Sequence, residues 1–480
     1  MSAMQTIWFD VTTIVHWHRP PVGVVRVEAE CFKYLAKLGQ PNIRFCHFDK
    51  RALSYHEIEA SYVLDIISRY GQEQPRPPLP NTETTAKRAT QRAKLVLQKL
   101  SPTVREPVID FATKVTPTLR NALHHYRRAS SAASQVATQL QQLSRPLRER
   151  ADSSAAAAPP PAPFRSGDVV ISAGLDWDQK DRVYLYQLKL ALGLKVILFC
   201  YDLIPVLLPH LCVGEVAGMF ARYFVDVAWC ADEVMCISRS SQRDFLNLVH
   251  ETGAPEPKTS IVRLGANLPL ETGGEGVEEL VQGKYLLFVS TIERRKNHEV
   301  IYRAIAQLVE SGRTDLPQVV FVGMMGWGVS DFLSDLRIDP RVRGRFTVLN
   351  HVTDAQLSML YSKALFTLYP SLYEGWGLPL AESLAHGKFC IASNSSSLPE
   401  VAGPLVDYVD PWESRRWGER IAHYLDHPEE LAQKEKAIRE RYRVPSWEDT
   451  GRTVFQAAQR LLNSPPASPE TNDSSSAPAL

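Results

Sequence analysis

The sequence predicts an α/β protein built from two doubly wound domains with parallel sheets. At 480 residues the chain is too long for one ordinary domain. Short runs that are apolar at nearly every position recur along it, and such runs are typical of strands buried on both faces of a parallel sheet. The stretches between these runs look helical, as in NHEVIYRAIAQLVESG (297–312). Alternation of such strands with helices indicates doubly wound sheets.

The predicted strands form two sets along the chain. The first set comprises residues 6–11, 43–48, 168–174, 195–200, 233–238 and 259–264. The second set comprises residues 284–290, 318–323, 346–350, 364–370 and 388–393. The stretch between the sets, 267–283, is polar and rich in glycine, which indicates a linker. We therefore expect a first domain over residues 1–275 and a second domain over residues 276–442.

A basic segment interrupts the first set. Residues 72–165 contain no strand-like run, and residues 85–150 hold 13 Lys and Arg against 3 Asp and Glu, a net charge of +10. The whole chain carries only +1, so the remaining residues carry −9. We expect a basic helical insertion in the first domain, which is either a solvated loop or a patch that binds an anionic membrane surface. The polar tail, 463–480, is expected to be disordered.

The composition excludes several classes of protein. Apolar residues make up 44% of the chain and charged residues 22%, the balance of a soluble globular protein. The net charge of +1 implies no nucleic-acid partner. We expect no transmembrane helix, because no run of about 18 apolar residues is present, and no signal peptide. The seven cysteines lack metal-site spacing, so we expect reduced thiols in a cytoplasmic protein and no metal.

Two glutamates with seven residues between them mark the candidate site. Glu374 lies in a glycine-rich turn after a predicted strand, and Glu382 lies in the helix that should begin near Leu378. In doubly wound sheets ligands bind beyond the carboxyl ends of the strands, and a helix N-terminus attracts phosphate. A carboxylate beside a phosphate should face uncharged hydroxyl groups, so we expect Glu374 to meet a sugar and Glu382 a ribose. The pattern predicts a nucleotide sugar as the ligand.

Each candidate residue also has a purely structural explanation. Glu374 and Glu382 could be solvated surface charges, Trp376 could be a packing residue, and Asp202 could cap a helix or turn. The cationic run 294–296 could be an ordinary helix start. Cations near a helix N-terminus oppose its dipole by about 0.3–1 kcal/mol each, so a bound anion explains this run better.

Four motifs in the second half resemble, in order and spacing, the retaining GT-B enzymes of glycosyltransferase family 4. They are STIERRKNHEVIYRAI (290–305), FVGMMGWG (321–328), VTDAQLSMLYSKA (352–364) and YEGWGLPLAESLAHGKFCIAS (373–393). Weaker matches in the first half are GVVRVEAE (23–30), YDLIPVLLP (201–209), ADEVMCISRSSQRD (231–244) and VRLGAN (262–267). The resemblance covers nearly the whole chain except the insertion and the tail. It implies a GT-B fold, with two domains facing a cleft and a helix over 443–462 that crosses back to the first domain.

The resemblance also implies residue roles. Arg295 and Lys296 would hold the diphosphate and stabilise the charge on the leaving group. Glu374 would bind hydroxyl groups of the donor sugar and Glu382 those of the ribose, with Asp202 as a further catalytic candidate. The remaining donor-binding candidates are Gly23, Tyr201, Arg294, Gly323, His351 and Val352, and the backbone N–H groups of Trp376, Gly377 and Leu378. The leaving phosphate would help to take the acceptor proton, so no metal or other cofactor is required.

Two positions depart from the family pattern. Many members have an arginine six residues before the phosphate-binding lysine, where this chain has Ser290, so Arg294 or Arg295 must substitute. Many also have a histidine before Asp202, where this chain has Tyr201, which leaves the sugar open.

The function expected from the resemblance is transfer of a hexose, with retention, from a nucleotide diphosphate sugar to a glycan or lipid-linked acceptor. The motifs look like those of bacterial enzymes of O-antigen or capsule assembly, often mannosyltransferases, which suggests GDP-mannose as donor. The enzyme would be cytoplasmic, or peripheral on the inner face of the plasma membrane. Three other classes stay open: a sugar phosphorylase, a nucleotide-sugar epimerase, and a non-enzymatic scaffold of a polysaccharide assembly complex.

Overall fold

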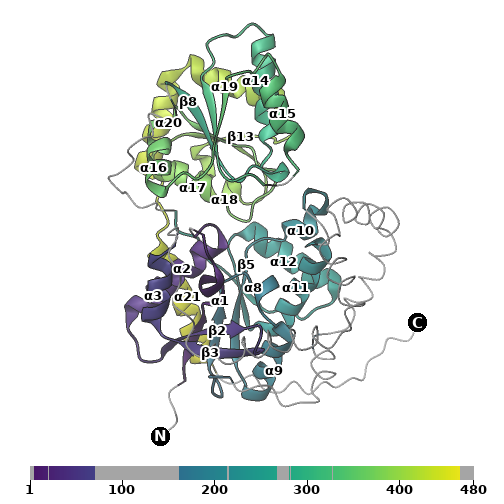
Figure 1. Cartoon of the computed structure of the whole chain (residues 1–480), viewed down its shortest axis with the longest axis vertical. Coiled ribbons are helices and arrows are strands. Elements are labelled where there is room, and N and C mark those ends of the chain that lie inside the picture. The colour runs from purple at the N-terminus through teal and green to yellow at the C-terminus, as the bar shows by residue number, and fades with distance from the viewer. Residues whose placement is uncertain are drawn as a thin grey trace, which may run out of the picture. The chain divides into compact units, whose positions relative to one another are not determined.

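The computed structural model describes residues 5–19, 21–70, 147, 162–212, 216–266, 281, 283–326 and 328–464. Most of the predicted insertion, 72–165, nearly all of the predicted linker and the tail beyond 464 lie outside these residues. Residues 1–67 and 146–480 belong to one compact unit, which carries both sheets. We call the residues that carry the first sheet the first domain and those that carry the second sheet the second domain (Figure 1).

The first sheet has seven strands in the order β3-β2-β1-β4-β5-β6-β7. Their bounds are β1 Ile7–Asp10, β2 Ile43–Asp49, β3 Ser54–Ile58, β4 Val169–Ser172, β5 Lys195–Cys200, β6 Glu233–Cys236 and β7 Lys258–Ile261. All neighbouring strands pair in parallel except β2 and β3, which are antiparallel. The six predicted strands are present. Strand β3 was not predicted, because two of its five residues are exposed and it lacks a continuous apolar run.

The second sheet has six strands, all parallel, in the order β10-β9-β8-β11-β12-β13. Their bounds are β8 Tyr285–Val289, β9 Gln318–Val322, β10 Phe346–Leu349, β11 Thr367–Tyr369, β12 Cys390–Ser393 and β13 Asp407–Val409. The five predicted strands are present. The unpredicted β13 is an edge strand of three residues, too short to stand out as an apolar run. The prediction of two parallel-sheet domains is confirmed.

Helices pack against both sheets (Figure 1). In the first domain they are α1 Thr12–His16, α2 Val24–Leu38, α3 Ala60–Ser68, α8 Asp176–Gln179, α9 Arg182–Leu192, α10 Ile204–Leu207, η1 Pro209–Leu211, α11 Val216–Cys230 and α12 Arg239–Thr252. In the second domain they are η2 Arg294–Lys296, α14 His298–Glu310, α15 Ser330–Ile338, α16 Asp354–Lys363, α17 Leu378–Ala385, α18 Leu398–Ala402, η3 Gly403–Leu405, α19 Ser414–Asp426 and α20 Pro428–Arg441. The last helix, α21 Trp447–Leu462, packs against α2 of the first domain.

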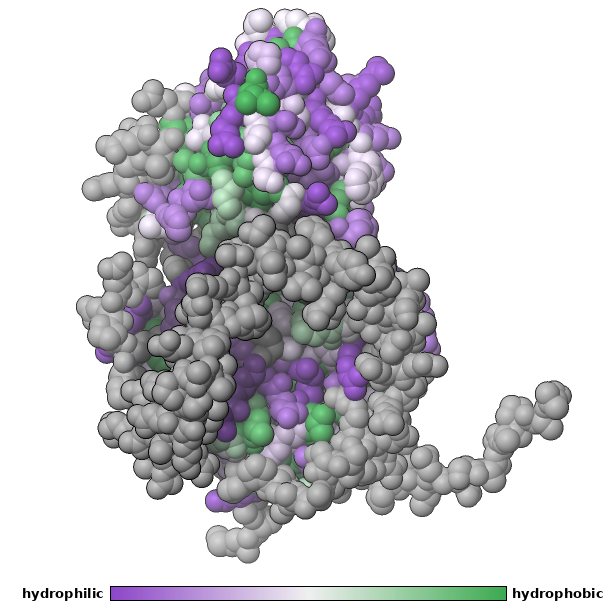
Figure 2. Space-filling model, turned by 45° about the vertical axis from the view of Figure 1, so that its right-hand side comes forward, coloured by the Kyte–Doolittle hydropathy of each residue, from purple (hydrophilic) through white to green (hydrophobic). Residues whose placement is uncertain are grey.

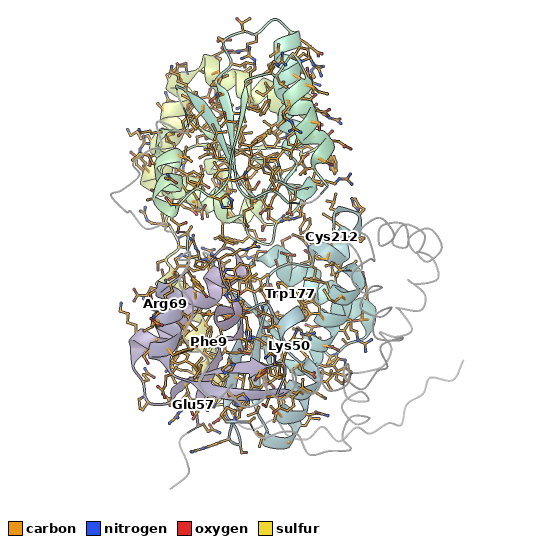
Figure 3. All side chains as sticks on the ribbon, in the orientation of Figure 1. Phe9, Lys50, Glu57, Arg69, Trp177 and Cys212 are labelled. Carbon is orange, nitrogen blue, oxygen red and sulfur yellow. The ribbon has the colours of Figure 1, made fainter. Side chains whose placement is uncertain are left out.

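The central strands of each sheet are mostly buried on both faces, which gives each domain its core. Phe9 of β1 is fully buried, and Figure 3 shows it among the side chains around the first sheet. Phe288 and Phe321 fill the same role in the second sheet, with ring centroids 5.5 Å apart. Polar and charged residues dominate the visible face of the second domain (Figure 2). None of the helices among the described residues has the length and apolar character needed to cross a membrane. The seven cysteines are all unpaired.

Candidate active site

The turn between β11 and α17 presents the first candidate carboxylate. Strand β11 ends at Tyr369, and α17 begins at Leu378, the predicted start, with Pro379 in its first turn. Pro379 suits this position because the N–H that it lacks would have no partner within the helix. Gly377 precedes the helix with a φ of 107°, a backbone conformation that residues other than glycine rarely adopt.

Glu374 lies in this turn and is held by two cations. Its Oε1 lies 2.5 Å from Lys296 Nζ, and its Oε2 lies 2.8 Å from Arg295 Nη1. The hydroxyl of Tyr369 also donates to Oε1, at 3.0 Å. Glu374 is only 7% exposed and Lys296 only 9%. The structure thus brings together three residues that the sequence assigned to catalysis. Sequence reasoning found all three but missed that the carboxylate pairs with the cations and that the cluster is buried.

The cluster keeps Glu374 ionised. Burial by itself would raise the pKa of Glu374, but the charges of Arg295 and Lys296 outweigh burial and lower that pKa to about 2. Burial and the charge of Arg295 lower the pKa of Lys296, while Glu374 acts in the opposite direction. Arg295 also pairs with Glu293, at 2.8 Å. An anion that entered here would meet two cations whose positions are already set by carboxylates, which is the preorganisation that charge stabilisation needs.

The first domain reaches the same turn through the end of β5. A Cβ atom on Gly375 would lie 2.3 Å from the carbonyl oxygen of Tyr201 and 3.1 Å from Cβ of Asp202. The hydroxyl of Ser241 donates to the carbonyl oxygen of Tyr201, at 2.8 Å, and to that of Gly375, at 3.3 Å. Only glycine permits so close an approach of the two loops.

Asp202 and Tyr201 differ in how they face the site. Burial raises the pKa of Asp202, and the charge of Arg295 opposes that rise, so Asp202 lies in the field of the cationic cluster. Its Oδ1 also accepts from the backbone N–H of Ile204, at 3.1 Å, so it caps the first turn of α10 as well. The side chain of Tyr201 packs in the first domain instead: its hydroxyl donates to the carbonyl oxygen of Ala173, at 2.5 Å.

Glu382 lies on α17 and is 7% exposed. Burial raises its pKa to about 7, and the charge of Arg26, from the first domain, opposes that rise. The hydroxyl of Tyr361 donates to its Oε2, at 3.1 Å. The carboxylate therefore accepts a hydrogen bond from Tyr361 and lies in the field of one cation. The sequence carried no signal for either partner.

The remaining donor candidates are placed as follows. Arg294 donates from Nε to the carbonyl oxygen of Gly328, at 3.1 Å, and is solvent-exposed. Gly323 has a φ of 155°, and a Cβ added to it would lie 2.0 Å from the carbonyl oxygen of Ser290.

The other candidates lie in loops. His351 is exposed with a φ of 61°, and Val352 beside it is half-buried. Gly23 begins α2 with a φ of 53° and has open space where a Cβ would stand.

Ser290 occupies the position where the family resemblance leads us to expect an arginine. Its Oγ lies 3.3 Å from Nε2 of His298. Burial lowers the pKa of His298 to about 3, so this ring is neutral. Neither residue supplies a positive charge. Within the described part of the chain, Arg295 and Lys296 are the cations that pair with Glu374.

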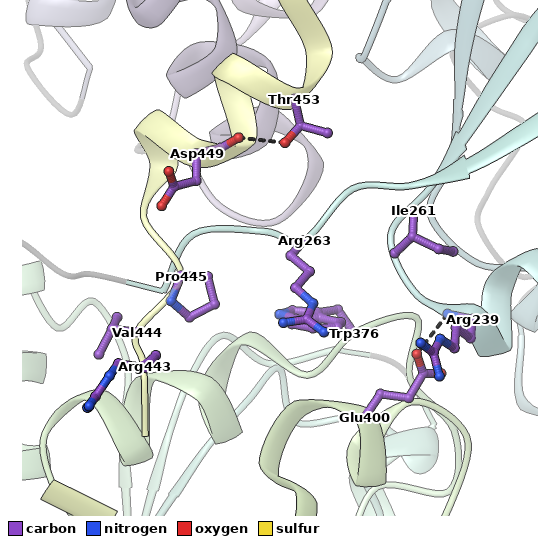
Figure 4. Close-up of a pocket in the computed structure, with 10 residues that line it drawn as sticks. All are labelled: Arg239, Ile261, Arg263, Trp376, Glu400, Arg443, Val444, Pro445, Asp449 and Thr453. Atoms are coloured by element: carbon purple, nitrogen blue, oxygen red, sulfur yellow. Dashed lines mark hydrogen bonds between the residues drawn. The ribbon is translucent and has the colours of Figure 1, made fainter. Parts of the chain in front are cut away.

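Trp376 borders a hollow of about 590 Å³ beside the turn (Figure 4). The residues that line it are Arg239, Ile261, Arg263, Trp376, Glu400, Arg443, Val444, Pro445, Asp449 and Thr453. Glu400, on α18, accepts from the backbone N–H groups of Arg239 and Ser240, each at 2.8 Å, and so caps α12 of the first domain. Trp376 itself is 5% exposed, and its indole Nε1 is buried without a hydrogen-bond partner among the described residues, so its place in the structure is consistent with a packing residue. Its backbone N–H remains a candidate donor at the start of α17.

Within the part of the chain that the structure describes, no group of three or more His, Cys, Asp or Glu side chains is arranged to hold a metal ion.

Residues 277–441 match the family model of the group 1 glycosyl transferases. The O-antigen chain mannosyltransferase B of Escherichia coli is 36% identical over 127 residues, which cover 26% of this chain and 33% of that protein. The serotype-specific mannosyltransferase WbdA of Escherichia coli is 26% identical over 196 residues, 38% of this chain and 24% of the relative. A D-inositol 3-phosphate glycosyltransferase of Thermobispora bispora is 28% identical over 225 residues, 43% of this chain and 50% of the relative. The chain thus spans half or less of the length of these relatives.

Solved structures share the fold of nearly the whole chain. Sucrose-phosphate synthase of Thermosynechococcus elongatus aligns over 95% of this chain and 99% of its own, with a TM-score of 0.56 and 17% identity. Anabaena HepE in complex with UDP aligns over 95% of this chain and 100% of its own, with a TM-score of 0.53 and 13% identity. The expected GT-B fold is confirmed. The chain has the GT-B fold, and its residues 277–441 match the family model of the group 1 glycosyl transferases.

Proposed function

We propose that the protein is a retaining glycosyltransferase of family 4 that moves a hexose from a nucleotide diphosphate sugar to a glycan or lipid-linked acceptor. The observation that carries this proposal is the buried cluster of Lys296, Arg295 and Glu374 at the turn before α17. Two cations held in place by carboxylates lie at the turn that leads into a helix N-terminus, whose first N–H groups lack partners within the helix. Such groups bind a diphosphate and an adjacent sugar.

Each group in the cluster has a task in the reaction. Arg295, Lys296 and the N–H groups of residues 376–378 bind the diphosphate and stabilise the charge that it gains as its bond to the sugar breaks. Glu374 stays ionised and accepts hydrogen bonds from sugar hydroxyls, while Glu382 accepts them from the ribose. The acceptor oxygen attacks from the face that the diphosphate leaves, and its proton passes to a leaving phosphate oxygen. The anomeric configuration is therefore retained.

We propose mannose, carried on GDP, as the donor sugar, and cell-surface polysaccharide assembly as the setting. The names of the two Escherichia coli relatives, both mannosyltransferases and one of them an O-antigen enzyme, support this choice. The tyrosine at position 201 does not oppose it, because its side chain packs within the first domain.

Turnover should not require a divalent metal, because Arg295 and Lys296 can neutralise the diphosphate.

The test of the proposed function and of metal independence has two steps. Thermal unfolding is first screened against UDP-, GDP-, ADP- and dTDP-sugars, where a ligand at 100 times its Kd should stabilise the protein by about 2.7 kcal/mol. Release of nucleotide diphosphate from the best donor is then measured with and without acceptor and with and without EDTA. We expect acceptor-dependent release that EDTA leaves unchanged.

Other results in the same assay identify the alternatives. Loss of activity in EDTA that Mg²⁺ or Mn²⁺ restores would overturn metal independence. Sugar phosphate formed from inorganic phosphate would indicate a phosphorylase, and a changed nucleotide sugar without an acceptor would indicate an epimerase. A protein that neither binds nor turns over any of the four donors would be a scaffold.

We also propose that the enzyme works at the inner face of the plasma membrane through the basic segment 85–150, which lies outside the described residues apart from Leu147. Its net charge of +10 supports this, because each basic residue near an anionic surface contributes about 1 kcal/mol. Flotation with anionic liposomes should show binding at low salt that high salt removes. A variant lacking 85–150 should stay unbound while it still glycosylates a soluble acceptor. Equal binding by that variant would refute the proposal.

A further inference from the structure

Arg26 of the first domain reaches a helix of the second domain. It lies on the first turn of α2, three residues after Gly23. Its Nη2 is 2.6 Å from Oδ2 of Asp354, the first residue of α16. The side chain of Arg26 is 15% exposed and that of Asp354 is 45% exposed. This pair links residues 328 positions apart, so it exists only when the two domains are in contact.

The charge of the same guanidinium also acts on Glu382. Among the charges that act on this buried carboxylate, that of Arg26 is the largest, and it favours the ionised form. Asp354 acts on Glu382 in the opposite sense, and the Tyr361 hydroxyl donates to Oε2. Asp354, which pairs with Arg26, and Tyr361, which donates to Glu382, both lie on α16, so Arg26 lies at the N-terminal end of the helix that also contacts Glu382.

A purely structural ion pair explains this arrangement poorly. An exposed pair contributes only about 0–1 kcal/mol, yet here an arginine gives up most of its hydration for one half-exposed aspartate. A guanidinium has five N–H donors, and among the described residues Asp354 accepts the only hydrogen bond from that of Arg26. Most of its donors are therefore available to a ligand beside Glu382.

We propose that Arg26, held by Asp354, is a donor-binding residue of the first domain that completes the nucleotide site around Glu382. The N–H groups that Asp354 does not use bind the ribose and the phosphate next to it. The nucleotide is then bound by both domains, and its binding favours their contact. This inference rests on the proposed function, in which Glu382 binds the ribose.

The arrangement has a consequence for the pH dependence of binding. Glu382 accepts hydrogen bonds from ribose hydroxyls best as a carboxylate, so affinity should fall as pH drops below about 7, the pKa to which burial raises this group. Arg26 and the hydroxyl of Tyr361 favour the carboxylate, and Asp354 disfavours it. Removal of Arg26 should therefore raise the pKa further and move the loss of affinity to higher pH.

The experiment measures the Kd of GDP and of UDP by calorimetry between about pH 6 and pH 8.5, with the full-length protein. The variants are Arg26→Ala, Arg26→Lys and Glu382→Gln, and thermal unfolding confirms that each is folded.

We expect Arg26→Ala to raise the Kd at pH 7 about tenfold, which corresponds to the free energy of one hydrogen bond to a charged group. The same variant should move the midpoint of the pH profile to higher pH. Arg26→Lys should restore part of the affinity and the original midpoint. Glu382→Gln should weaken binding and flatten the profile.

Glu400→Gln is the matched control. Glu400 also joins the two domains, through the backbone N–H groups of Arg239 and Ser240, but it does not act on Glu382. It should leave both the Kd and the midpoint unchanged. If Glu400→Gln weakens binding as much as Arg26→Ala does, Arg26 serves only general domain contact and the inference is overturned.

The outcomes separate this inference from the proposed function. Unchanged nucleotide binding in Glu382→Gln would remove the ribose assignment, and with it the proposed site. Weakened binding in Glu382→Gln, together with a wild-type Kd and midpoint in Arg26→Ala, would overturn the role of Arg26 alone.

Discussion

Replacing Lys296 by alanine should lower kcat/KM about 10²–10³-fold, the loss typical when one preset charge-stabilising group is removed. Lys296 lies 2.5 Å from Glu374 and, with Arg295, forms the cationic side of the cluster. Without it, a single cation would meet the charge on the departing diphosphate. Glu374→Gln should lower kcat/KM in the same way, because the amide cannot hold both cations. Steady-state release of nucleotide diphosphate measures both effects.

Stability should fall together with activity, because these residues are buried. Glu374 is not the solvated surface charge that the structural explanation would require, since it is 7% exposed, and Lys296 is 9% exposed. The pKa of Glu374 is lowered from 4.5 to about 2, so its ionisation contributes stability that is fully present above pH 4.5 and lost as pH falls toward 2. This contribution to the free energy of unfolding is roughly 3 kcal/mol. The gap in unfolding free energy between wild type and Lys296→Ala should therefore narrow between about pH 4.5 and pH 2.

Lys434→Ala is the control for Lys296→Ala. Lys434 also pairs with a carboxylate of the second domain, Asp407, at 3.0 Å, but has no contact with the cluster. The Lys434→Ala variant should keep the wild-type kcat/KM, even if its free energy of unfolding changes. Wild-type kinetics in Lys296→Ala would show that the cluster is not the reaction site.

Replacing Gly375 by alanine should lower kcat/KM about 10²-fold, the cost of a displacement of about 1 Å in a catalytic geometry. The new Cβ would lie 2.3 Å from the carbonyl oxygen of Tyr201, a backbone atom that cannot rotate away. The turn that carries Glu374 must therefore move away from the first domain. Forced contacts of this kind also destabilise by about 1–3 kcal/mol. Kinetics and thermal unfolding measure the two effects.

Gly418→Ala, on α19 of the same domain, is the control for Gly375→Ala. The nearest atom to its added Cβ, outside its own helix, is the carbonyl oxygen of Ala304, at 3.4 Å. Alanine is also favoured over glycine within a helix, by about 1 kcal/mol. This variant should be as active and at least as stable as the wild type. Equal activity of Gly375→Ala and Gly418→Ala would mean that the two loops do not meet as the structure shows.

The two strands missed from the sequence, β3 and β13, lie at edges of their sheets. Nine of the eleven predicted strands are central, and the other two, β7 and β10, are edge strands of four residues. The apolar signal weakens at an edge, because solvent reaches part of the strand. Strand β3 has two exposed residues among its five, and β13 has only three residues. Only the pairing with β2 and β12 identifies them.

The candidate site shows a similar division. Glu374 and Glu382 stand out in the sequence because glycines and a helix start surround them, and Lys296 because cations at a helix start need an anion. Their partners do not stand out. Lys296 and Glu374 are 78 residues apart and meet because β8 and β11 are neighbours in the second sheet. Arg26 lies in an ordinary amphipathic helix, and nothing in its local pattern distinguishes it from a surface arginine.

The sequence by itself determined the two parallel sheets, the start of α17 and the residue types at the site, because burial on both strand faces and the chemistry of turns are local properties that leave periodic or positional patterns. The tertiary structure decided which charges pair, that Glu374 and Lys296 are buried, that the Tyr201 side chain packs in the first domain, and that Arg26 pairs with Asp354. These depend on which strands lie side by side and on the contact of the two domains. Local sequence carries no record of such contacts, because the electrostatic energy of a pair depends on its distance and burial and not on its separation along the chain.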